Sequence, residues 1–145
     1  MCPSTTSSAV SSDRSIDDDL CPWFESERLA VLGINTARSL TIKDGRINHD
    51  QMGMIRERFR AVPESRTRIL VTHHPLFAMP IGEEAELTKS VGRHEDALLA
   101  VADAGVHILL AGHFHRSYVG SARDMVENAG PALVIQAGTA TSTRL

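Results

Sequence analysis

Histidines gather at two places in the sequence, in a pattern typical of metal ligands. One group is His113-Phe114-His115 and the other is His73-His74. In an extended backbone, residues i and i+2 project to the same side, so His113 and His115 would face one space while Phe114 points into the core. Imidazole is a common ligand for zinc, iron, manganese and nickel. We therefore expect His73, His113 and His115 to bind metal.

His74 has three possible roles, as a ligand, a partner of a ligand, or a contact to substrate phosphate, and an outer or substrate role is favoured over direct ligation. The remaining histidines have simpler interpretations. His49 and His94 lie near the starts of predicted helices and should face solvent, and His107 lies early in a predicted strand, where a half-buried position is more common.

Carboxylates are missing from the places where a two-metal centre would need them. Hydrolytic sites with two metal ions usually include a carboxylate that bridges the ions. No Asp or Glu follows any predicted strand, and Asp17 to Asp19 lie in a polar leader. The histidines alone are neutral donors, and nothing in the sequence bridges them.

Four short apolar runs predict buried strands, and two amphipathic segments between them predict helices. The helix over 48–62 has Asn48 or Asp50 near its N-cap and ends before Pro63, and the helix over 91–104 ends at Gly105. The predicted strands are 29–34, 69–72, 106–111 and 132–137.

Alternation of strands with helices predicts an α/β fold with a parallel sheet. In such sheets, ligands bind at the carboxyl ends of the strands. The unusual clusters follow strands in just that way: Asn35-Thr36, His73-His74, His113-x-His115 and Gly138-Thr139.

Composition excludes several function classes. The chain has 145 residues, 42% apolar and 23% charged, and no apolar run is long enough to span a membrane. Residues 1–22 are polar and predicted to be disordered, without a secretory signal, so a cytoplasmic location is expected. The arginines between 56 and 68 alternate with glutamates and apolar residues, which favours a solvated helix face over a nucleic-acid surface. The two cysteines predict no disulfide framework.

Two motifs resemble those of a known family. Thr72-His73-His74-Pro75-Leu76 and Gly112-His113-Phe114-His115-Arg116-Ser117 are similar to the last two motifs of the calcineurin-like metallophosphoesterases. The segments 33–39 and 136–142 resemble bacterial members, including the cyclic-nucleotide phosphodiesterase-like branch. The resemblance covers residues 23–145.

The resemblance implies part of a β-sandwich with helices outside, in the order strand-helix-strand-helix-strand-strand. It also implies hydrolysis of phosphomonoesters or phosphodiesters by hydroxide activated by two metal ions, commonly Mn, Fe or Zn. His73 and His113 would bind one ion and His115 the other. His74, Asn35 and Arg116 would contact a small phosphoester, with cyclic nucleotides among the candidates.

The Asp-x-His, Gly-Asp and Asn-His motifs of the family are absent from the sequence. We therefore expect the C-terminal part of a metallophosphoesterase, truncated and inactive alone, with weak metal binding and open sheet edges that favour self-association. One alternative is a non-catalytic metal-binding or pairing module. The other is a hydrolase with a single metal ion held by three histidines.

Overall fold

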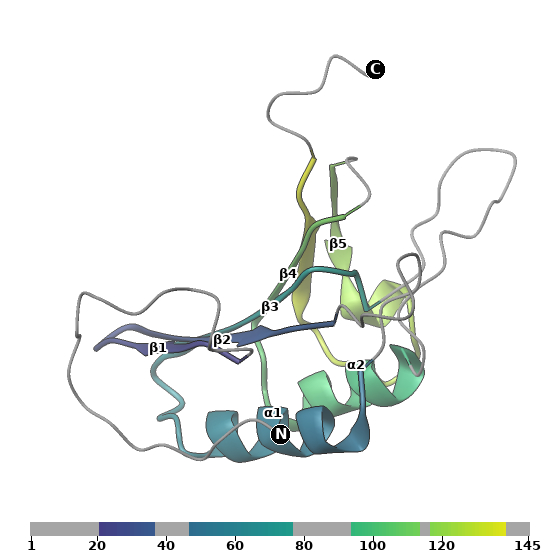
Figure 1. Cartoon of the computed structure of the whole chain (residues 1–145). Helices are drawn as coiled ribbons and strands as arrows, with labels where there is room; N and C mark the ends of the chain where they lie inside the picture. Colours follow the sequence, from purple (N-terminus) through teal and green to yellow (C-terminus); the bar gives the residue numbers. More distant parts are fainter. Residues whose placement is uncertain (1–20, 37–46, 77–93, 114–116, 139–145) are drawn as a thin grey trace, which may run out of the picture.

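The computed structural model describes residues 21–36, 47–76, 94–113 and 117–138. Within these ranges the chain forms strands, two α-helices and a short 3-10 helix (Figure 1). In chain order they are β1 (Trp23–Glu25), β2 (Leu29–Ile34), α1 (His49–Arg60), β3 (Thr67–Thr72), α2 (His94–Asp103), β4 (Ile108–Ala111), β5 (Tyr118–Ser121), η1 (Ala122–Asp124) and β6 (Leu133–Gln136).

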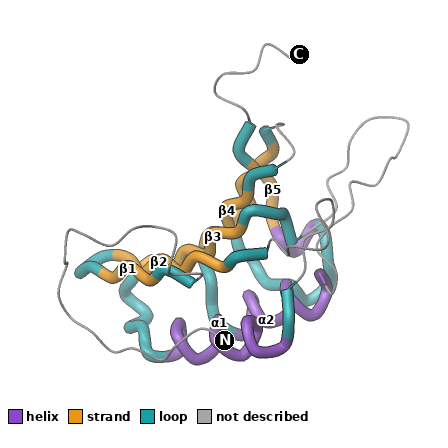
Figure 2. Tube along the Cα trace, viewed as in Figure 1, coloured by secondary structure: helices purple, strands orange, loops and turns teal. Residues whose placement is uncertain are grey.

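The strands form one mixed sheet in the order β1-β2-β3-β4-β6-β5. The four inner strands β2, β3, β4 and β6 are parallel, and the edge strands β1 and β5 are antiparallel to their neighbours. The sheet twists strongly from β1 to β5, as Figure 2 shows. We call the edge where the four parallel strands end the carboxyl edge.

Both helices lie on the same face of the sheet (Figure 1). The chain runs from β2 through α1 to β3, and from β3 through α2 to β4, so each crossover moves one strand further in the same direction. Crossovers between parallel strands are almost always right-handed, and two such steps in one direction place their helices on the same side.

The helix ends follow the signals in the sequence. Asn48 caps α1 by accepting from the Gln51 backbone N–H at 2.8 Å, and the Gln51 side chain accepts from the Asn48 N–H in return. Gln51 also donates to the Asn35 carbonyl at 2.8 Å, which fixes the start of α1 to the end of β2. Gly105 follows α2 with a φ of 61°, and Val106 N–H donates to the Val101 carbonyl, which closes the helix in a Schellman motif.

The face beneath the helices, which we call the covered face, holds the hydrophobic core. Phe59 of α1 and Leu98 of α2 are fully buried against the sheet. The strand residues of this face are similarly buried, namely Ala30, Leu32, Ile34, Leu70, Leu109 and Val134. Burying an aliphatic side chain of this size contributes about 1.5–3 kcal/mol, so these positions dominate the stability of the chain.

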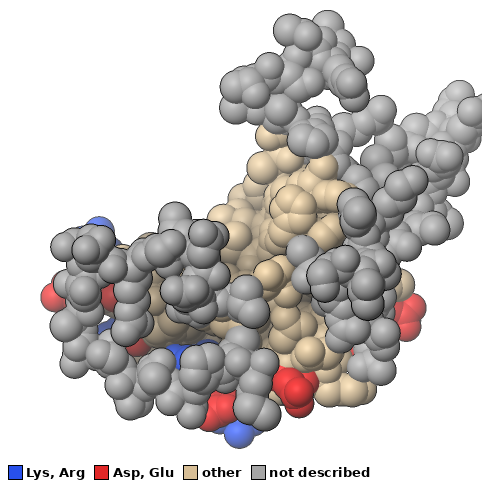
Figure 3. All heavy atoms as spheres, viewed as in Figure 1, with Lys and Arg blue, Asp and Glu red and all other residues tan. Residues whose placement is uncertain are grey.

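The opposite face, which we call the open face, is also apolar but more exposed. Its residues alternate with those of the core, and the strand register places them in two rows. They are Phe24, Val31, Ile69, Ile108 and Leu133 in one row, and Val71, Leu110, Ile135 and Val119 in the other. Val119 is 65% exposed and Phe24 is 53% exposed. In Figure 3 the charged residues lie around the helices and β1, and the visible described surface over β4 and β5 is uncharged.

Arginines in α1 and in the segment after it make contacts within the chain. Arg66 forms an ion pair with Glu25 of β1, and Arg56 pairs with Asp103 of α2 at 3.1 Å. Arg68 donates to the carbonyls of Val62 and Gly105, which follow the ends of the two helices. Cations are favourable at such positions because helix C-termini carry partial negative charge.

The predicted fold class is confirmed, with corrections. The four predicted strands and both helices are present, but the edge strands β1 and β5 were missed. Cys21 is buried and disulfide-bonded, so the prediction of no disulfide is wrong; Cys2, in the predicted disordered leader, lies outside the described residues. Among the described helices, none is long and apolar enough to cross a membrane.

Candidate metal centre

The carboxyl edge brings together side chains from four strands. Thr36 follows β2, His73 and His74 follow β3, His113 follows β4, and Gln136 ends β6. Register explains their proximity, because Ile34, Thr72, Ala111 and Gln136 are aligned across the sheet. Residues immediately after these positions therefore meet at one place.

His73 and His113 face each other across this edge. The His73 Nε2 and His113 Nδ1 atoms are 3.2 Å apart, and the two rings pack edge to face with centroids 5.1 Å apart. His73 is exposed and His113 is half-buried. The pair is therefore preformed yet accessible from solvent.

His74 lies on the buried side of the same cluster. It is 5% exposed, and its ring centroid is 4.4 Å from that of His113. Thr36 Oγ1 accepts from the His74 backbone N–H at 3.0 Å and also lies 3.0 Å from its Nδ1. Thr72 Oγ1 donates to the His74 carbonyl at 2.8 Å. With Thr36 and Thr72 both buried, His74 is fixed at its backbone and at one ring nitrogen.

The backbone at His113 is in an uncommon conformation. Its φ is 80°, in the left-handed region that non-glycine residues rarely adopt. Such a residue costs on the order of 1–3 kcal/mol and persists only where its surroundings hold it. The extended backbone expected at His113 is therefore wrong. The turn also does not depend on Gly112 for space, because a Cβ there would make only ordinary contact with the His73 carbonyl at 3.7 Å.

Two hydrogen bonds hold the turn before His113. The Gly112 N–H donates to the His73 carbonyl at 3.1 Å, which ties the end of β4 to β3. The Gln136 side-chain Nε2 donates to the Gly112 carbonyl and, at 3.3 Å, to the Ala137 carbonyl. The Gly112 N–H and carbonyl, which belong to the peptide groups before and after this residue, are thus both held by hydrogen bonds.

The spacing of the histidine nitrogens fits a metal ion. Two nitrogens bound tetrahedrally to one zinc, each at about 2.0–2.1 Å, lie about 3.3 Å apart. The His73 Nε2 and His113 Nδ1 atoms are 3.2 Å apart, and the donor atoms of His73, His74 and His113 all lie within 4.8 Å of one another. In the described part of the chain, this is the one such cluster of His, Cys, Asp and Glu.

The predicted site residues are partly placed. His73 and His113 come together as the sequence indicated, and His74 joins them as a potential third donor. Asn35 is exposed at the end of β2, next to Thr36. His115 and Arg116 lie outside the described residues. Of the other histidines, His49 begins α1 and is exposed as expected, whereas His94 is half-buried and His107 is exposed, which corrects both expectations. His107 accepts from the Arg68 backbone N–H at 2.9 Å.

The sequence placed Thr36 in a cluster after a predicted strand but assigned it no role, and it assigned none to Gln136. Both are buried polar residues, with exposures of 0% and 1%. Their positions in the sequence could have indicated them. Gln136 ends an apolar strand and Thr36 closely follows one, and a polar residue that is buried there needs a hydrogen-bond partner.

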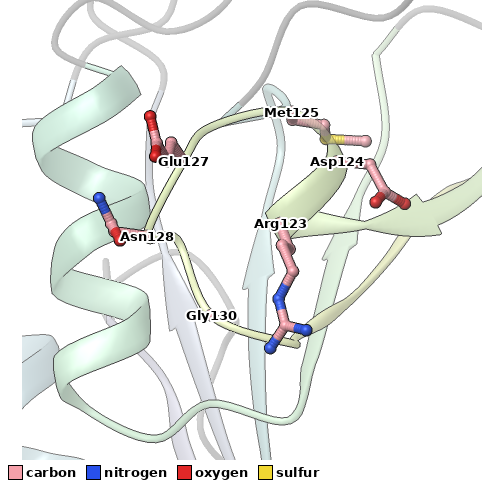
Figure 4. A pocket seen from close by; sticks show the side chains of 6 residues that line it. All are labelled: Arg123, Asp124, Met125, Glu127, Asn128 and Gly130. Carbon is pink, nitrogen blue, oxygen red and sulfur yellow. The ribbon is translucent and has the colours of Figure 1, made fainter.

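A hollow in the described surface lies at the end of β6 opposite to the histidines (Figure 4). Ser121, just before η1, pairs with Leu133 at the start of β6, whereas the histidines lie beyond its end. The hollow is lined by Arg123, Asp124, Met125, Glu127, Asn128 and Gly130 from η1 and the following loop. Its charged side chains do not form a metal-binding cluster within the described residues.

Comparisons with known proteins agree with the fold. At the level of sequence, no protein-family model and no curated protein matches the chain. The structure is similar to a purple acid phosphatase from yellow lupin (Lupinus luteus) seeds, with a TM-score of 0.57 and 15% identity, over 81% of this chain and 22% of the phosphatase. A weaker likeness is to a candidate 5′-nucleotidase from Staphylococcus aureus in complex with α-ketoglutarate. Its TM-score is 0.47, with 16% identity over 88% of this chain and 25% of that one.

The chain thus spans about a fifth of the length of the lupin phosphatase. At this level of identity the likeness concerns the fold alone. The mixed sheet with two helices therefore resembles part of the fold of that phosphatase, and it agrees with the α/β fold class predicted from the sequence.

Proposed function

We propose that this chain supplies the histidine side of a divalent metal centre that hydrolyses phosphoesters. The observation that carries the proposal is the His73–His113 nitrogen pair, 3.2 Å apart at the carboxyl edge, with His74 beside it. The likeness to a phosphatase fold supports the reaction class, and the motifs around the histidines support the same family.

The residues of the chain have distinct roles in this proposal. A divalent ion held by His73 and His113 would polarise a phosphoryl oxygen as a Lewis acid. His74 would donate a ring N–H to the phosphate, because a Thr36 hydroxyl that donates to Nδ1 leaves the proton on Nε2. Asn35 and Arg116 are proposed as further substrate contacts, Arg116 because a guanidinium can bind a phosphate group with two hydrogen bonds.

We further propose that the complete centre holds two ions, with His115 on the second. Two cations repel each other unless anionic donors lie between them, and the described cluster contains only neutral imidazoles. The bridging carboxylate would therefore come from polypeptide outside the described residues. The described part alone would bind one ion weakly and hydrolyse little. A cyclic nucleotide is one candidate substrate, by the sequence resemblance alone.

A second candidate function is a hydrolase that uses one metal ion. Three histidines within 4.8 Å, without a carboxylate, also match the ligand set of single-zinc enzymes such as those with three histidines and an open fourth position. In that case His74 binds the ion through Nε2, and its Nδ1–H donates to Thr36 Oγ1.

Titration of the purified chain with Co²⁺, followed by visible absorption, tests the metal site. We expect one ion per chain, bound at micromolar affinity or weaker. His73→Ala and His113→Ala should each weaken binding by more than about 100-fold, beyond the loss typical for a residue that only supports a ligand. His49→Ala, at the exposed start of α1, is the matched control and should bind as the unmodified chain does. Unchanged binding by His73→Ala and His113→Ala would remove the proposed site.

Hydrolysis of bis-p-nitrophenyl phosphate separates the two candidate functions. If the centre needs two ions and an outside carboxylate, the metal-loaded chain should act near the blank rate, because fixing the reacting groups in place can contribute about 7–11 kcal/mol. Rapid metal-dependent turnover, lost in His74→Ala, would instead establish the single-metal enzyme.

A further inference from the structure

We infer that Gln136 is a positioning residue for His113, acting through the backbone rather than on the metal ion or substrate. This inference deepens the proposed function and rests on it for its metal-binding test. It begins from the buried amide at the end of β6, which the proposed chemistry does not use.

The Gln136 side chain is polar and almost completely buried, with 1% exposed. Its Nε2 donates to two carbonyls, those of Gly112 and Ala137. This orientation of the amide is the only sensible one, because a reversed amide would direct its oxygen at two other oxygens. Its Oε1 is buried and has no hydrogen-bond partner within the described residues.

That arrangement is unfavourable for stability. A buried acceptor without a donor loses its hydration and gains nothing in return, and an apolar side chain of the same size would avoid the loss. Such features concentrate at functional sites, where a side chain does something other than stabilise the fold. The role of Gln136 is thus to be sought in what its Nε2 holds.

The Nε2 holds one of the two peptide planes that define φ at His113. The angle φ measures rotation about the His113 N–Cα bond, relative to the peptide group that contains the Gly112 carbonyl. Gln136 fixes that carbonyl from the β6 side, and the Gly112 N–H is fixed from the β3 side by the His73 carbonyl. With the peptide groups on both sides of Gly112 held, the plane from which φ of His113 is measured is fixed, which favours the observed φ of 80° and the 3.2 Å separation between His113 Nδ1 and His73 Nε2.

Strand register makes the interaction possible. Gln136 is aligned with Ala111, one residue before Gly112, so its side chain needs to reach only the next peptide along β4. Val134, two residues earlier on β6 and equally buried, is on the same face but is aligned with Leu109, well inside the strand. Val134 therefore packs in the core without touching the turn, and it provides a matched control.

The test compares Gln136→Met with Val134→Ala in the full chain. Methionine keeps the size and burial of glutamine but cannot donate, so the Gly112 carbonyl is released. We expect Gln136→Met to melt close to the temperature of the unmodified chain, because the loss of the Nε2 hydrogen bonds is offset by removal of the unpaired Oε1, and to bind Co²⁺ about 10–100-fold more weakly, with an altered absorption spectrum. Val134→Ala should melt lower and bind Co²⁺ with unchanged affinity and spectrum.

A measurement without metal separates this inference from the proposed function. In the metal-free chain, the ring-nitrogen NMR shifts of His73 and His113 report their mutual contact, and Gln136→Met should move them while Val134→Ala does not. Failure of the unmodified chain to bind Co²⁺ would contradict the metal site, and the NMR comparison would still decide the role of Gln136. Unchanged ring shifts in Gln136→Met, or a loss of Co²⁺ affinity that Val134→Ala reproduces, would overturn the inference.

Discussion

The two faces of the sheet are both apolar, yet only the covered face is packed against the helices. On β3 the contrast falls on adjacent residues: Leu70 is fully buried beneath the helices, and Val71 on the open face is 36% exposed. The alternation continues beyond the strand, where His73 is exposed and His74 is buried. At the carboxyl edge, β3 is therefore followed by one histidine on each face of the sheet.

The residues that stabilise the fold and the residue that is available to a ligand therefore lie on different faces of the sheet. Residues of the covered face contribute most of the buried apolar area, and the buried histidine, His74, is fixed there by Thr36 and Thr72. Residues of the open face contribute less to the folded chain, and they lead to His73, whose ring nitrogen is available to a ligand. Substitutions on the two faces should therefore have different consequences.

The largest effect should come from the core of the covered face. Leu70→Ala removes a fully buried side chain between the sheet and the helices and should lower the free energy of unfolding by about 2–5 kcal/mol. Val71→Ala, at the neighbouring exposed position, should lower it by less than about 1 kcal/mol. Urea unfolding of both variants measures the difference.

Equal losses in the two variants would contradict the comparison. They would mean that the open face is packed in solution, either on another copy of the chain or on other polypeptide. Repeating the unfolding over a range of protein concentrations identifies a second copy, because association makes the apparent stability depend on concentration.

The parts of the fold that follow from local pattern were predictable. The periodicity of Met52, Ile55 and Phe59 indicated α1, and Asn48 and Gly105 marked helix ends that the structure confirms. The edge strands were missed because three or four residues, such as Trp23–Glu25, are too short for an alternation to be recognised. Strand order and register depend on pairing across the chain, which no local pattern records.

The candidate metal site was predictable to about the same extent as the fold. His73 and His113 follow strands whose ends meet, so the sequence could bring them together. Gln136 also ends such a strand, but its role could not be inferred in this way, because that role depends on its alignment with Ala111. The left-handed backbone of His113 was missed as well, since it results from hydrogen bonds to neighbouring strands rather than from its own residue type.

A smaller effect should distinguish the two possible roles of His74. Thr36→Val removes the hydroxyl beside His74 Nδ1 while keeping the shape of the side chain. If His74 donates to phosphate, Co²⁺ affinity should change by less than about threefold, and inorganic phosphate should bind the Co²⁺-loaded chain about tenfold more weakly, the value of one hydrogen bond to a charged group. Calorimetry with Co²⁺ and then with phosphate measures both.

The opposite result would reassign His74. A loss of Co²⁺ affinity of about tenfold or more in Thr36→Val is typical of a residue that orients a metal ligand. It would make His74 the third ligand and favour the single-metal enzyme. The control is Ser65→Ala, an exposed position away from the carboxyl edge, which should leave both affinities unchanged.

The smallest effect on the folded chain should come from the open face at its β5 edge. Val119 is 65% exposed on an edge strand, and unpaired strand edges favour pairing with another chain. Val119→Lys should change the free energy of unfolding by no more than about 0.5 kcal/mol, because little is buried there. The same lysine should oppose association, so sedimentation at high concentration should show fewer oligomers than for the unmodified chain.

Val71→Lys is the control in the middle of the open face. Association lost in Val71→Lys but kept in Val119→Lys would show that the face, not the edge, joins the copies.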